Sequence, residues 1–250
     1  MEFLRHIFAF DSNSPLLFTQ FYFWAFFALV YAVFALIMEF PMAKRPVGGT
    51  PSNSPSGRPS TTKLHLRNIF LMAVSWFFYY KTSGLFLLIL LFVTLSDWLI
   101  AKRIYQASGI RKPESGKWKA QLWLALSIII DLGLLCYFKY AYFFTNVVND
   151  LLGTEFAVFD IFAYIGNGFS ESGRFMVDRI ILPVGISFYL FQVMSYTIDV
   201  YRGHVQPVKN LLDFGFYVSF FPGLVAGPIV RANEFIPQLY RPFRLSRRLF

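Results

Sequence analysis

Polar side chains inside otherwise apolar stretches are the first candidates for chemistry in this sequence. The apolar stretch 180–201 and the residue after it carry five of them at offsets of 0, 3, 4, 7 and 10: Gln192, Ser195, Tyr196, Asp199 and Arg202. These offsets place all five on one face of a helix, which we call the polar stripe. Such a face avoids lipid. It therefore faces either other helices, in a packed hydrogen-bonded seam, or a solvated passage for substrate, and the sequence leaves both interpretations open.

Three further ionisable residues lie inside apolar stretches, where a charge at the centre of a membrane helix costs about 2.5–3.5 kcal/mol on insertion scales. Asp97 and Lys139 lie near the ends of their stretches. Because their charged groups can reach the membrane interface there, we expect them to act as anchors. Asp131 lies closer to the middle of its stretch, with Ser127 one helical turn before it. We expect Asp131 to make an interhelical hydrogen bond.

The usual arrangements for catalysis and metal binding are missing from the sequence. His6, His65 and His204 lie in predicted loops or at interfaces, where a solvated surface histidine is the expected state. There is no nucleophile elbow, phosphate-binding loop or zinc-protease motif. Cys136 is the one cysteine, which excludes an intrachain disulfide and a multi-cysteine metal site. On spacing alone, the sequence predicts no metal site and no catalytic residue.

The composition indicates the kind of elements that must hold these residues. Of the 250 residues, 56% are hydrophobic, 20% are aromatic and 15% are charged, whereas a soluble domain carries about 25% charged residues. The mean hydropathy is +0.50. These values exclude disordered, collagen-like and coiled-coil classes and indicate an integral membrane protein. The net charge of +9 does not indicate a nucleic-acid partner, because basic residues in membrane proteins mark cytoplasmic loops.

The apolar runs predict an all-α, polytopic transmembrane helix bundle with about five spans plus a re-entrant or broken helical element. Residues 16–38 are 23 consecutive uncharged residues, and as a helix they would reach about 34 Å, enough to cross a hydrocarbon core of about 30 Å. This run is too long for a signal peptide and lacks a cleavage site. The next run is too long for one span and is broken near Lys81–Gly84. The predicted spans are 16–38, 66–80, 84–101, 120–144 and 180–201.

The distribution of charge predicts the orientation of these spans. Stretch 39–67 is basic and rich in Pro, Gly and Ser, and we interpret it as a flexible cytoplasmic loop. Stretch 102–119 carries six basic residues and one acidic residue, whereas 145–179 carries five acidic residues and two arginines. Under the positive-inside rule, the two basic stretches lie in the cytoplasm and the acidic one lies outside.

The stretch 210–230 does not fit a straight span. A full crossing would place the arginines after Val230 outside, against the bias of the earlier loops. Within this stretch, three glycines and two prolines would interrupt a helix: Gly215, Pro222, Gly223, Gly227 and Pro228. We predict a re-entrant element, with an ordinary kinked span as the alternative, and a basic amphipathic segment after it on the cytoplasmic face.

Three motifs carry a resemblance to a known family. They are LPVGISFYLFQVMSYTIDVYRG at 182–203, DFGFYVSFFPGLVAGPIVR at 213–231 and EFIPQL at 234–239. These motifs resemble the core of the membrane-bound O-acyltransferase family, in the bacterial branch that includes alginate O-acetyltransferase and the D-alanyl transfer protein of teichoic acid modification. Weaker similarity extends upstream through WFFYY at 76–80 and GLLCYFKYAYFF at 133–144.

The resemblance implies an enzyme of the bacterial cytoplasmic membrane that crosses it several times. It implies transfer of an acyl group, expected to be acetyl, from a cytoplasmic thioester to a hydroxyl of an extracytoplasmic polysaccharide or partner protein. The thioester, of coenzyme A or of an acyl carrier protein, would be a co-substrate rather than a bound cofactor. Family members carry a catalytic histidine well downstream of the GPIVR-type motif. We therefore expect that histidine beyond Phe250, expect this chain to be the N-terminal part of the family domain, and assign the role to none of its histidines.

The residues that match the family motifs form a candidate substrate passage, which we call the motif core. It comprises Pro183, Gly185, Gln192, Ser195, Tyr196, Asp199, Tyr201, Arg202, Pro222, Gly227, Pro228 and Arg231. Arg202 or Arg231 at the cytoplasmic mouth would contact a phosphate of the donor; snorkelling or interhelical pairing is the alternative for both. For the whole chain, two other functions stay open: a non-catalytic membrane scaffold, or a transporter-like subunit of a cell-envelope polysaccharide system.

Overall fold

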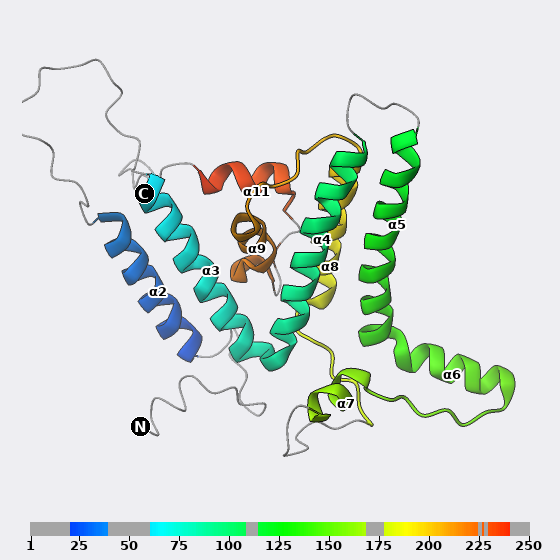
Figure 1. Cartoon of the computed structure of the whole chain (residues 1–250). Coiled ribbons are helices and arrows are strands. Elements are labelled where there is room, and N and C mark those ends of the chain that lie inside the picture. Colours follow the sequence, from blue (N-terminus) through cyan, green and yellow to red (C-terminus); the bar gives the residue numbers. More distant parts are fainter. Residues whose placement is uncertain are drawn as a thin grey trace, which may run out of the picture.

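The computed structural model describes residues 21–39, 61–108, 115–168, 178–224, 227 and 230–240. The regular structure in these ranges is helical (Figure 1), which confirms the predicted all-α class. The α-helices are α2 (Phe21–Glu39), α3 (Thr61–Ser83), α4 (Leu87–Ala107), α5 (Ser115–Leu135), α6 (Ala141–Leu152), α7 (Ile161–Gly168), α8 (Ile186–Tyr201), α9 (Leu211–Ser219), α10 (Phe221–Leu224) and α11 (Ala232–Leu239). A 3₁₀ turn, Gly84–Phe86, joins α3 to α4, and a π-turn, Cys136–Tyr140, joins α5 to α6.

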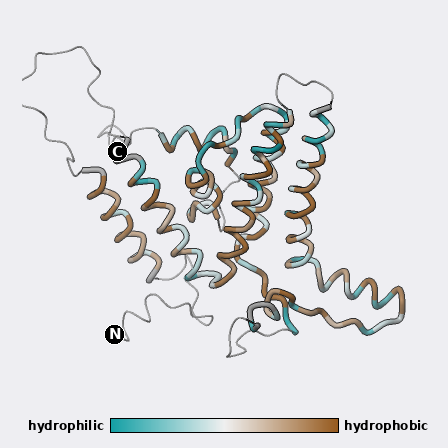
Figure 2. The backbone as a smooth tube through the Cα atoms, viewed as in Figure 1, coloured by the Kyte–Doolittle hydropathy of each residue, from teal (hydrophilic) through white to brown (hydrophobic). Residues whose placement is uncertain are grey.

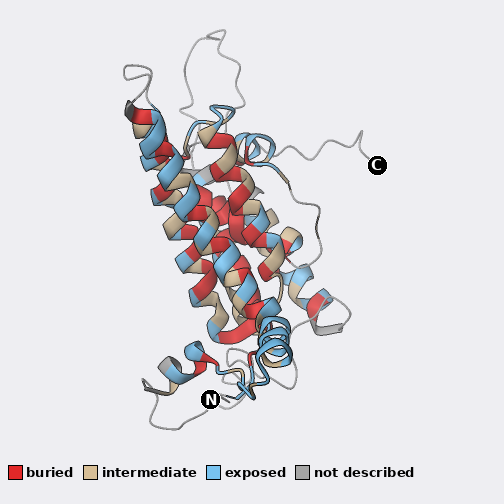
Figure 3. Ribbon diagram, turned by 90° about the vertical axis from the view of Figure 1, so that its right-hand side faces the viewer, coloured by how far each residue is buried: buried red, intermediate tan, exposed pale blue. Residues whose placement is uncertain are grey.

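Helix α4 lies at the centre of the bundle and packs against α5, α8 and α9. Helix α3 packs against α2 on one side and α9 on the other, so α9 is enclosed between α3 and α4. The core contains large side chains with no exposed surface, among them Tyr79, Leu90, Val93 and Tyr189. Figure 3 shows the buried residues along the inner faces of the long helices and the exposed ones on the outside. The core is therefore formed mainly between α4, α5 and α8.

Two continuous helical stretches, 65–107 and 116–152, are long and apolar enough to cross a membrane. The first is bent at the 3₁₀ turn, where α3 and α4 meet in a V (Figure 1). Helix α2 contains a shorter apolar stretch, 23–37. Hydrophilic residues gather at one end of the bundle, where α3 and α5 begin and α11 lies (Figure 2). Since these findings do not fix the number of crossings, the count of five spans stays a prediction.

The predicted span 120–144 is replaced by a helix, a turn and a second helix that leaves the bundle. The π-turn interrupts the regular hydrogen-bond ladder, a common cause of bending, and α6 runs away from the axis of α5 (Figure 1). The predicted acidic outer segment, 145–179, contains the rest of α6 and α7. It also exposes large apolar side chains such as Leu151 and Leu152, which are 78% and 69% exposed. These side chains do not suit a purely water-facing loop.

The predicted loop 39–67 is too long at its C-terminal end. Residues 40–60 lie outside the described residues, but α3 begins at Thr61. Arg67, which the loop prediction placed in water, is buried. Its guanidinium donates to the backbone carbonyl of Leu239, and the Asn68 amide donates to the same oxygen over 3.4 Å. The start of α3 is therefore held against the end of α11 by Arg67, which the composition assigned to a loop, and by the neighbouring Asn68.

The predicted span 180–201 forms a helix only from Ile186 onwards. Residues 180–185 are not helical, and the chain turns at Gly185, whose φ is +74°. Helix α8 has 16 residues, which corresponds to about 24 Å and is less than the thickness of a hydrocarbon core. The apolar run was extended too far toward its N-terminus, because apolar composition does not distinguish a helix from the buried extended chain that leads into it.

The stretch 210–230 is a broken helical element. Helix α9 ends at Ser219, Phe220 takes an extended ψ of 106°, and α10 follows for four residues. Pro228 lies outside the described residues. Helix α11 then begins directly after Arg231 and lies across one end of the bundle (Figure 1). The broken form agrees with the interruptions expected from glycine and proline.

Candidate functional site

Two glycines of the motif core are required by close backbone contacts. A Cβ built on Gly185 would lie 2.3 Å from the carbonyl oxygen of Leu224, and the positive φ there disfavours other residues independently. A Cβ on Gly227 would lie 2.5 Å from the Cα of Gly223. The start of α8 thus packs directly on the backbone of α10. Nearby, Pro183 is buried, whereas Pro222 in α10 is exposed.

The polar stripe binds mainly to backbone groups of neighbouring segments. The amide of Gln192 donates to the carbonyl of Tyr217 over 2.9 Å. The hydroxyl of Tyr217 in turn donates to the carbonyl of Val230 over 3.0 Å. These two bonds connect α8, α9 and the chain that returns toward α11. Ser195 donates to the carbonyl of Gln192 within α8, so it closes a local turn rather than an interhelical contact.

The C-terminal half of the stripe holds the chain that follows α8. Tyr196 has no exposed surface, and its hydroxyl accepts the backbone N–H of Val208 over 3.0 Å. The carboxyl of Asp199 lies 3.6 Å from Nδ1 of His204, an exposed histidine. Tyr201 is half-buried, and Arg202 is exposed. The inner part of the stripe is therefore a packed, hydrogen-bonded seam, which is one of the two arrangements that the sequence left open.

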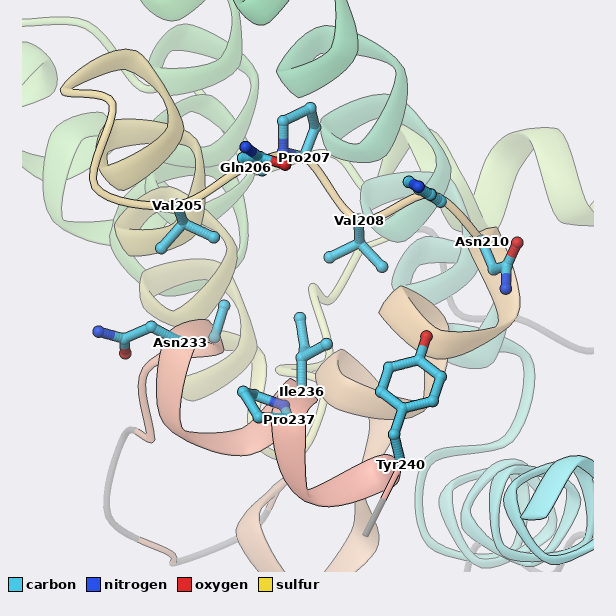
Figure 4. Close-up of a pocket in the computed structure, with 11 residues that line it drawn as sticks. Val205, Gln206, Pro207, Val208, Asn210, Asn233, Ile236, Pro237 and Tyr240 are labelled. Carbon is cyan, nitrogen blue, oxygen red and sulfur yellow. The ribbon is translucent and has the colours of Figure 1, made fainter. Parts of the chain in front are cut away.

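A groove of about 320 Å³ lies between the two ends of the broken element (Figure 4). One wall is formed by residues 205–210 and the other by α11 and Tyr240, and we call it the 205–240 groove. Its lining includes apolar side chains of Val205, Val208 and Ile236. Because both walls meet here, the chain before α9 and the chain that forms α11 lie at the same end of the bundle; whether 210–230 is re-entrant in a membrane stays a prediction.

Hydrogen bonds close one end of the groove. The hydroxyl of Tyr240 donates to Oδ2 of Asp213, and the amide of Asn210 donates to the same oxygen over 3.1 Å. Partial burial, followed by this contact with Asp213, raises the pKa of Tyr240 to about 12. Tyr240 therefore keeps its hydroxyl proton at neutral pH and remains a donor. The pair fixes the end of α11 to the first turn of α9.

Three exposed cations lie in or beside the segments that form the groove. Lys209 is part of the lining, Arg231 immediately precedes α11, and Arg202 directly follows α8, three residues before Val205. The groove therefore combines an apolar lining with positive charge at its edge. Such a surface can hold the apolar arm of a ligand together with its anionic groups.

The ionisable residues of the apolar stretches are placed differently from the prediction in one case. Asp97 is 1% exposed and accepts a hydrogen bond from Ser127 over 2.6 Å, so its anchoring role is wrong. Asp131 is fully buried, and its carboxyl oxygens have no hydrogen-bond partner within the described residues, so the expected interhelical hydrogen bond is not confirmed. Lys139 is exposed, with its ammonium 5.5 Å from the Tyr140 ring. A position near the end of an apolar run does not reveal which way a side chain points.

Within the described residues, histidines and metal-ligand groups do not gather at a site. His65 and His204 are exposed, and His6 lies outside the described residues. No three His, Cys, Asp or Glu side chains of the described ranges could share a metal ion. Arg67 and Asn68, which hold α11, were missed by the motif search. Their one signal was an arginine followed by a neutral polar residue immediately before a long apolar run.

Comparisons with known proteins find similarity to O-acetyltransferases. It is 38% identical over 172 residues to the probable alginate O-acetylase AlgI of Azotobacter vinelandii, covering 69% of this chain and 30% of that relative. The AlgI protein of Pseudomonas aeruginosa is also 38% identical, over 69% of this chain and 29% of the relative. The peptidoglycan O-acetyltransferase of Helicobacter pylori is 28% identical over 194 residues, covering 68% and 32%. No family model and no solved structure matches.

These similarities confirm the resemblance drawn from the three motifs. The chain is a homologue of these O-acetyltransferases, which is consistent with a part of a membrane-bound O-acyltransferase. More particularly, it is related to proteins named for acetylation of alginate and of peptidoglycan. It spans about 30% of the length of the alginate O-acetylases that it matches.

Proposed function

We propose that this chain is part of a membrane O-acetyltransferase that moves an acetyl group from a cytoplasmic thioester to a hydroxyl of a cell-envelope polysaccharide. In this reaction the acceptor oxygen forms a bond to the acetyl carbonyl carbon, the carbon–sulfur bond breaks, and the hydroxyl proton passes to a general base. Similarity to two groups of O-acetyltransferases supports the reaction. The arrangement that carries our assignment of a role to this chain is the 205–240 groove.

The groove suits the donor rather than the acceptor. A thioester on a phosphopantetheine arm, whether of coenzyme A or of a carrier protein, has a long, uncharged and partly apolar chain that ends in phosphate. Val205, Val208 and Ile236 offer apolar lining. Lys209 lines the groove, and the adjacent Arg231 is exposed. In our proposal the cations bind the phosphate, and the re-entrant element guides the thioester into the bundle.

The location of the groove supports a cytoplasmic donor. It lies at the hydrophilic end of the bundle, where the basic stretch between α4 and α5 also begins. The positive-inside rule assigns such an end to the cytoplasm. In this proposal the chain is a multi-pass protein of the bacterial inner membrane. The acetyl acceptor, a polysaccharide or a partner protein, approaches from the side of α6 and α7.

The general base in this proposal is a histidine beyond Phe250. The part of the chain described by the structure supplies the passage and the donor site. Gly185 and Gly227 permit close packing of irregular backbone, and the seam formed by Gln192, Tyr196 and Tyr217 holds that backbone in place. The three residues would therefore act as positioning residues.

The test is acetyl transfer by the full-length protein that contains this chain, expressed in a strain lacking its own O-acetylase. Membrane vesicles are supplied with acetyl-coenzyme A or an acetylated carrier protein, and ester-linked acetate on the polysaccharide is measured. We expect Lys209→Ala and Arg231→Ala each to raise KM for the donor about tenfold, the effect of losing about 1.4 kcal/mol of binding. The kcat should change little, because neither residue touches the reacting atoms.

Lys119→Ala is the matched control, because Lys119 is an exposed lysine near the start of α5 and outside the groove. It should leave KM unchanged. Unaltered KM in the groove variants would remove the donor role from the groove while leaving the acetyltransferase intact. Absence of any acetate transfer by the full-length protein would contradict the reaction itself and favour a scaffold or transporter function.

A further inference from the structure

The interior of the bundle contains a pair of carboxyls that the proposed function does not use. Asp97 on α4 and Asp131 on α5 are 1% and 0% exposed. Oδ2 of Asp97 and both carboxyl oxygens of Asp131 are buried without a hydrogen-bond partner in the described part of the chain. Each carboxyl lies within electrostatic range of the other. Buried polar atoms are almost always paired, so three unpaired oxygens at one place indicate something bound there.

The hydroxyl groups beside the pair are already committed. Ser127 donates to Oδ1 of Asp97 over 2.6 Å. Thr197 on α8 lies 3.2 Å from the Ser127 hydroxyl, and its own hydroxyl is in bonding range of the Val193 and Met194 carbonyls. Each hydroxyl has one proton to donate. Neither hydroxyl therefore supplies a donor to the free oxygens.

The remaining titratable groups that face the pair are phenols. Asp131 lies within electrostatic range of Tyr189, and Asp97 lies within range of Tyr196, both on α8. Tyr79 on α3 contacts the Tyr189 ring edge to face, with centroids 6.4 Å apart. The hydroxyls of Tyr79 and Tyr189 are buried and also lack hydrogen-bond partners in the described ranges, whereas Tyr196 already accepts from Val208.

The pair has no positive partner among the described residues, since neither aspartate makes an ion pair there. Two ionised carboxylates side by side in a dry interior repel each other, and each pays a desolvation penalty of several kcal/mol. One bound positive charge removes both difficulties. Ser127 already donates to Asp97, which favours the ionised form of that carboxyl, whereas Asp131 has no donor within the described ranges. Of the two carboxyls, that of Asp131 is therefore the one that is neutralised.

We propose that Asp97 and Asp131 form a proton-binding site inside the bundle, with one acid proton on Asp131 that is donated to Oδ2 of Asp97. This bond joins α4 to α5. Thr197 connects it to α8, the helix that carries the polar stripe. The inference does not depend on the acetyltransferase function, because it rests on the burial and hydrogen bonding of these residues.

Infrared spectroscopy of the purified chain in detergent tests the proposal directly. At neutral pH the spectrum should contain the carbonyl-stretch band of a protonated carboxylic acid, shifted in D₂O. Asp131→Asn should remove this band, because an amide replaces the acid. The melting temperature of Asp131→Asn should stay close to that of the unaltered chain, since the Asn amide can donate to Asp97 as the acid does.

Stability measured against pH gives a second test. Raising the pH removes the shared proton and leaves two adjacent negative charges, so the melting temperature of the unaltered chain should fall in alkaline buffer. The Asp131→Asn variant has a single carboxylate that keeps two donors, and it should show a smaller fall.

Asp160→Asn is the matched control. Asp160 is also buried, but its Oδ1 accepts bonds from the Tyr137 hydroxyl and from the amides of Phe162 and Ala163. Asp160 therefore lies in a hydrogen-bonded site of its own, apart from the α4–α5 pair. Asp160→Asn should therefore leave the acid band in place and lower the melting temperature.

Two results would overturn the proposal. One is the absence of an acid band that depends on Asp131. The other is a melting temperature that rises with sodium or potassium chloride relative to choline chloride at equal ionic strength, and that loses this response in Asp131→Asn. The second result would identify an alkali cation, rather than a proton, as the bound charge.

Discussion

Polar side chains are buried in two regions of this bundle, and their surroundings differ. In the region formed by α8, α9 and α11, the side chains of Gln192, Tyr196 and Tyr217 each bond to a backbone group of another segment. In the region between α4 and α5, three carboxyl oxygens of Asp97 and Asp131 have no such partner within the described residues. Both regions lie against the same helix, α8.

The difference follows from the backbone available in each region. Helices α4 and α5 are regular, and their backbone groups are used within the helices, so side chains between them can bond only to one another or to something bound. The broken element and the loop after α8 leave backbone N–H and carbonyl groups free, and the polar stripe satisfies them. A polar residue beside irregular backbone is therefore structural here, whereas a polar pair between regular helices needs a ligand.

The largest expected effect follows from disturbing the irregular backbone at the start of α8. Gly185→Ala should destabilise the chain by about 3 kcal/mol or more, because it adds strain at positive φ to a clash with the Leu224 carbonyl. Thermal unfolding in detergent, together with the yield of folded protein, measures this. Gly203→Ala separates the two causes, because Gly203 has the same φ of +74° but open space around it. It should cost only about 1 kcal/mol.

The next effect is expected where α3 holds α11. Arg67→Ala should destabilise the chain by about 2 kcal/mol, because a buried guanidinium no longer donates to the Leu239 carbonyl. Limited proteolysis of α11 should become faster in parallel with the fall in melting temperature. Lys119→Ala, at an exposed position, is the control and should change neither. Unchanged proteolysis in Arg67→Ala would show that α11 is held by its apolar face alone.

A smaller effect is expected when one hydroxyl of the hydrogen-bonded seam is removed. Tyr217→Phe should cost about 1 kcal/mol, because the carbonyl of Val230 loses its donor. The melting temperature measures the loss. A full-length enzyme with this change should also show lower kcat than the unaltered one, since the backbone of the passage is held less tightly. A neutral effect on both would mean that solvent can replace the hydroxyl.

The smallest expected effect gives the most direct test of the difference between the two polar regions. Tyr189→Phe should change the free energy of unfolding by less than about 0.5 kcal/mol, because its hydroxyl is buried but makes no hydrogen bond to any residue that the structure describes. Tyr189 and Tyr217 lie on adjacent helices and are equally deep, so the two variants form a matched pair. A loss in Tyr189→Phe as large as in Tyr217→Phe would show that an unseen ligand or water bonds this hydroxyl, and would remove the distinction between the two regions.

Much of the fold class was accessible from composition and periodicity. Long apolar runs predict helices because a helix satisfies its own backbone, and the break near Lys81–Gly84 was evident from its residue types. The ends of elements were harder to predict. Residues 180–185 are as apolar as α8, yet they are not helical because Pro183 and the turn at Gly185 prevent it. The start of α3 was hidden for the opposite reason, since its first turn is polar.

The candidate site was predictable in its members but not in its contacts. Helical spacing identified the polar stripe, and the motifs identified Gly185 and Gly227. Neither indicated that the stripe bonds to the backbone of α9, nor that Arg67 reaches across to Leu239. Those partners lie 25 and 172 residues away, and local patterns contain no information about contacts at such separation.

What the sequence determined by itself is therefore the class of molecule: an all-α, apolar bundle with a broken element, a basic end and the motifs of an O-acyltransferase. These properties depend on residue type and on spacing within one helix. The tertiary structure alone decided that Asp97 points inward rather than toward an interface, that it lies near Asp131, and that the two walls of the groove meet. Each depends on how helices are rotated and packed, and a side chain near a helix end has the same sequence signature whether it faces water or the core.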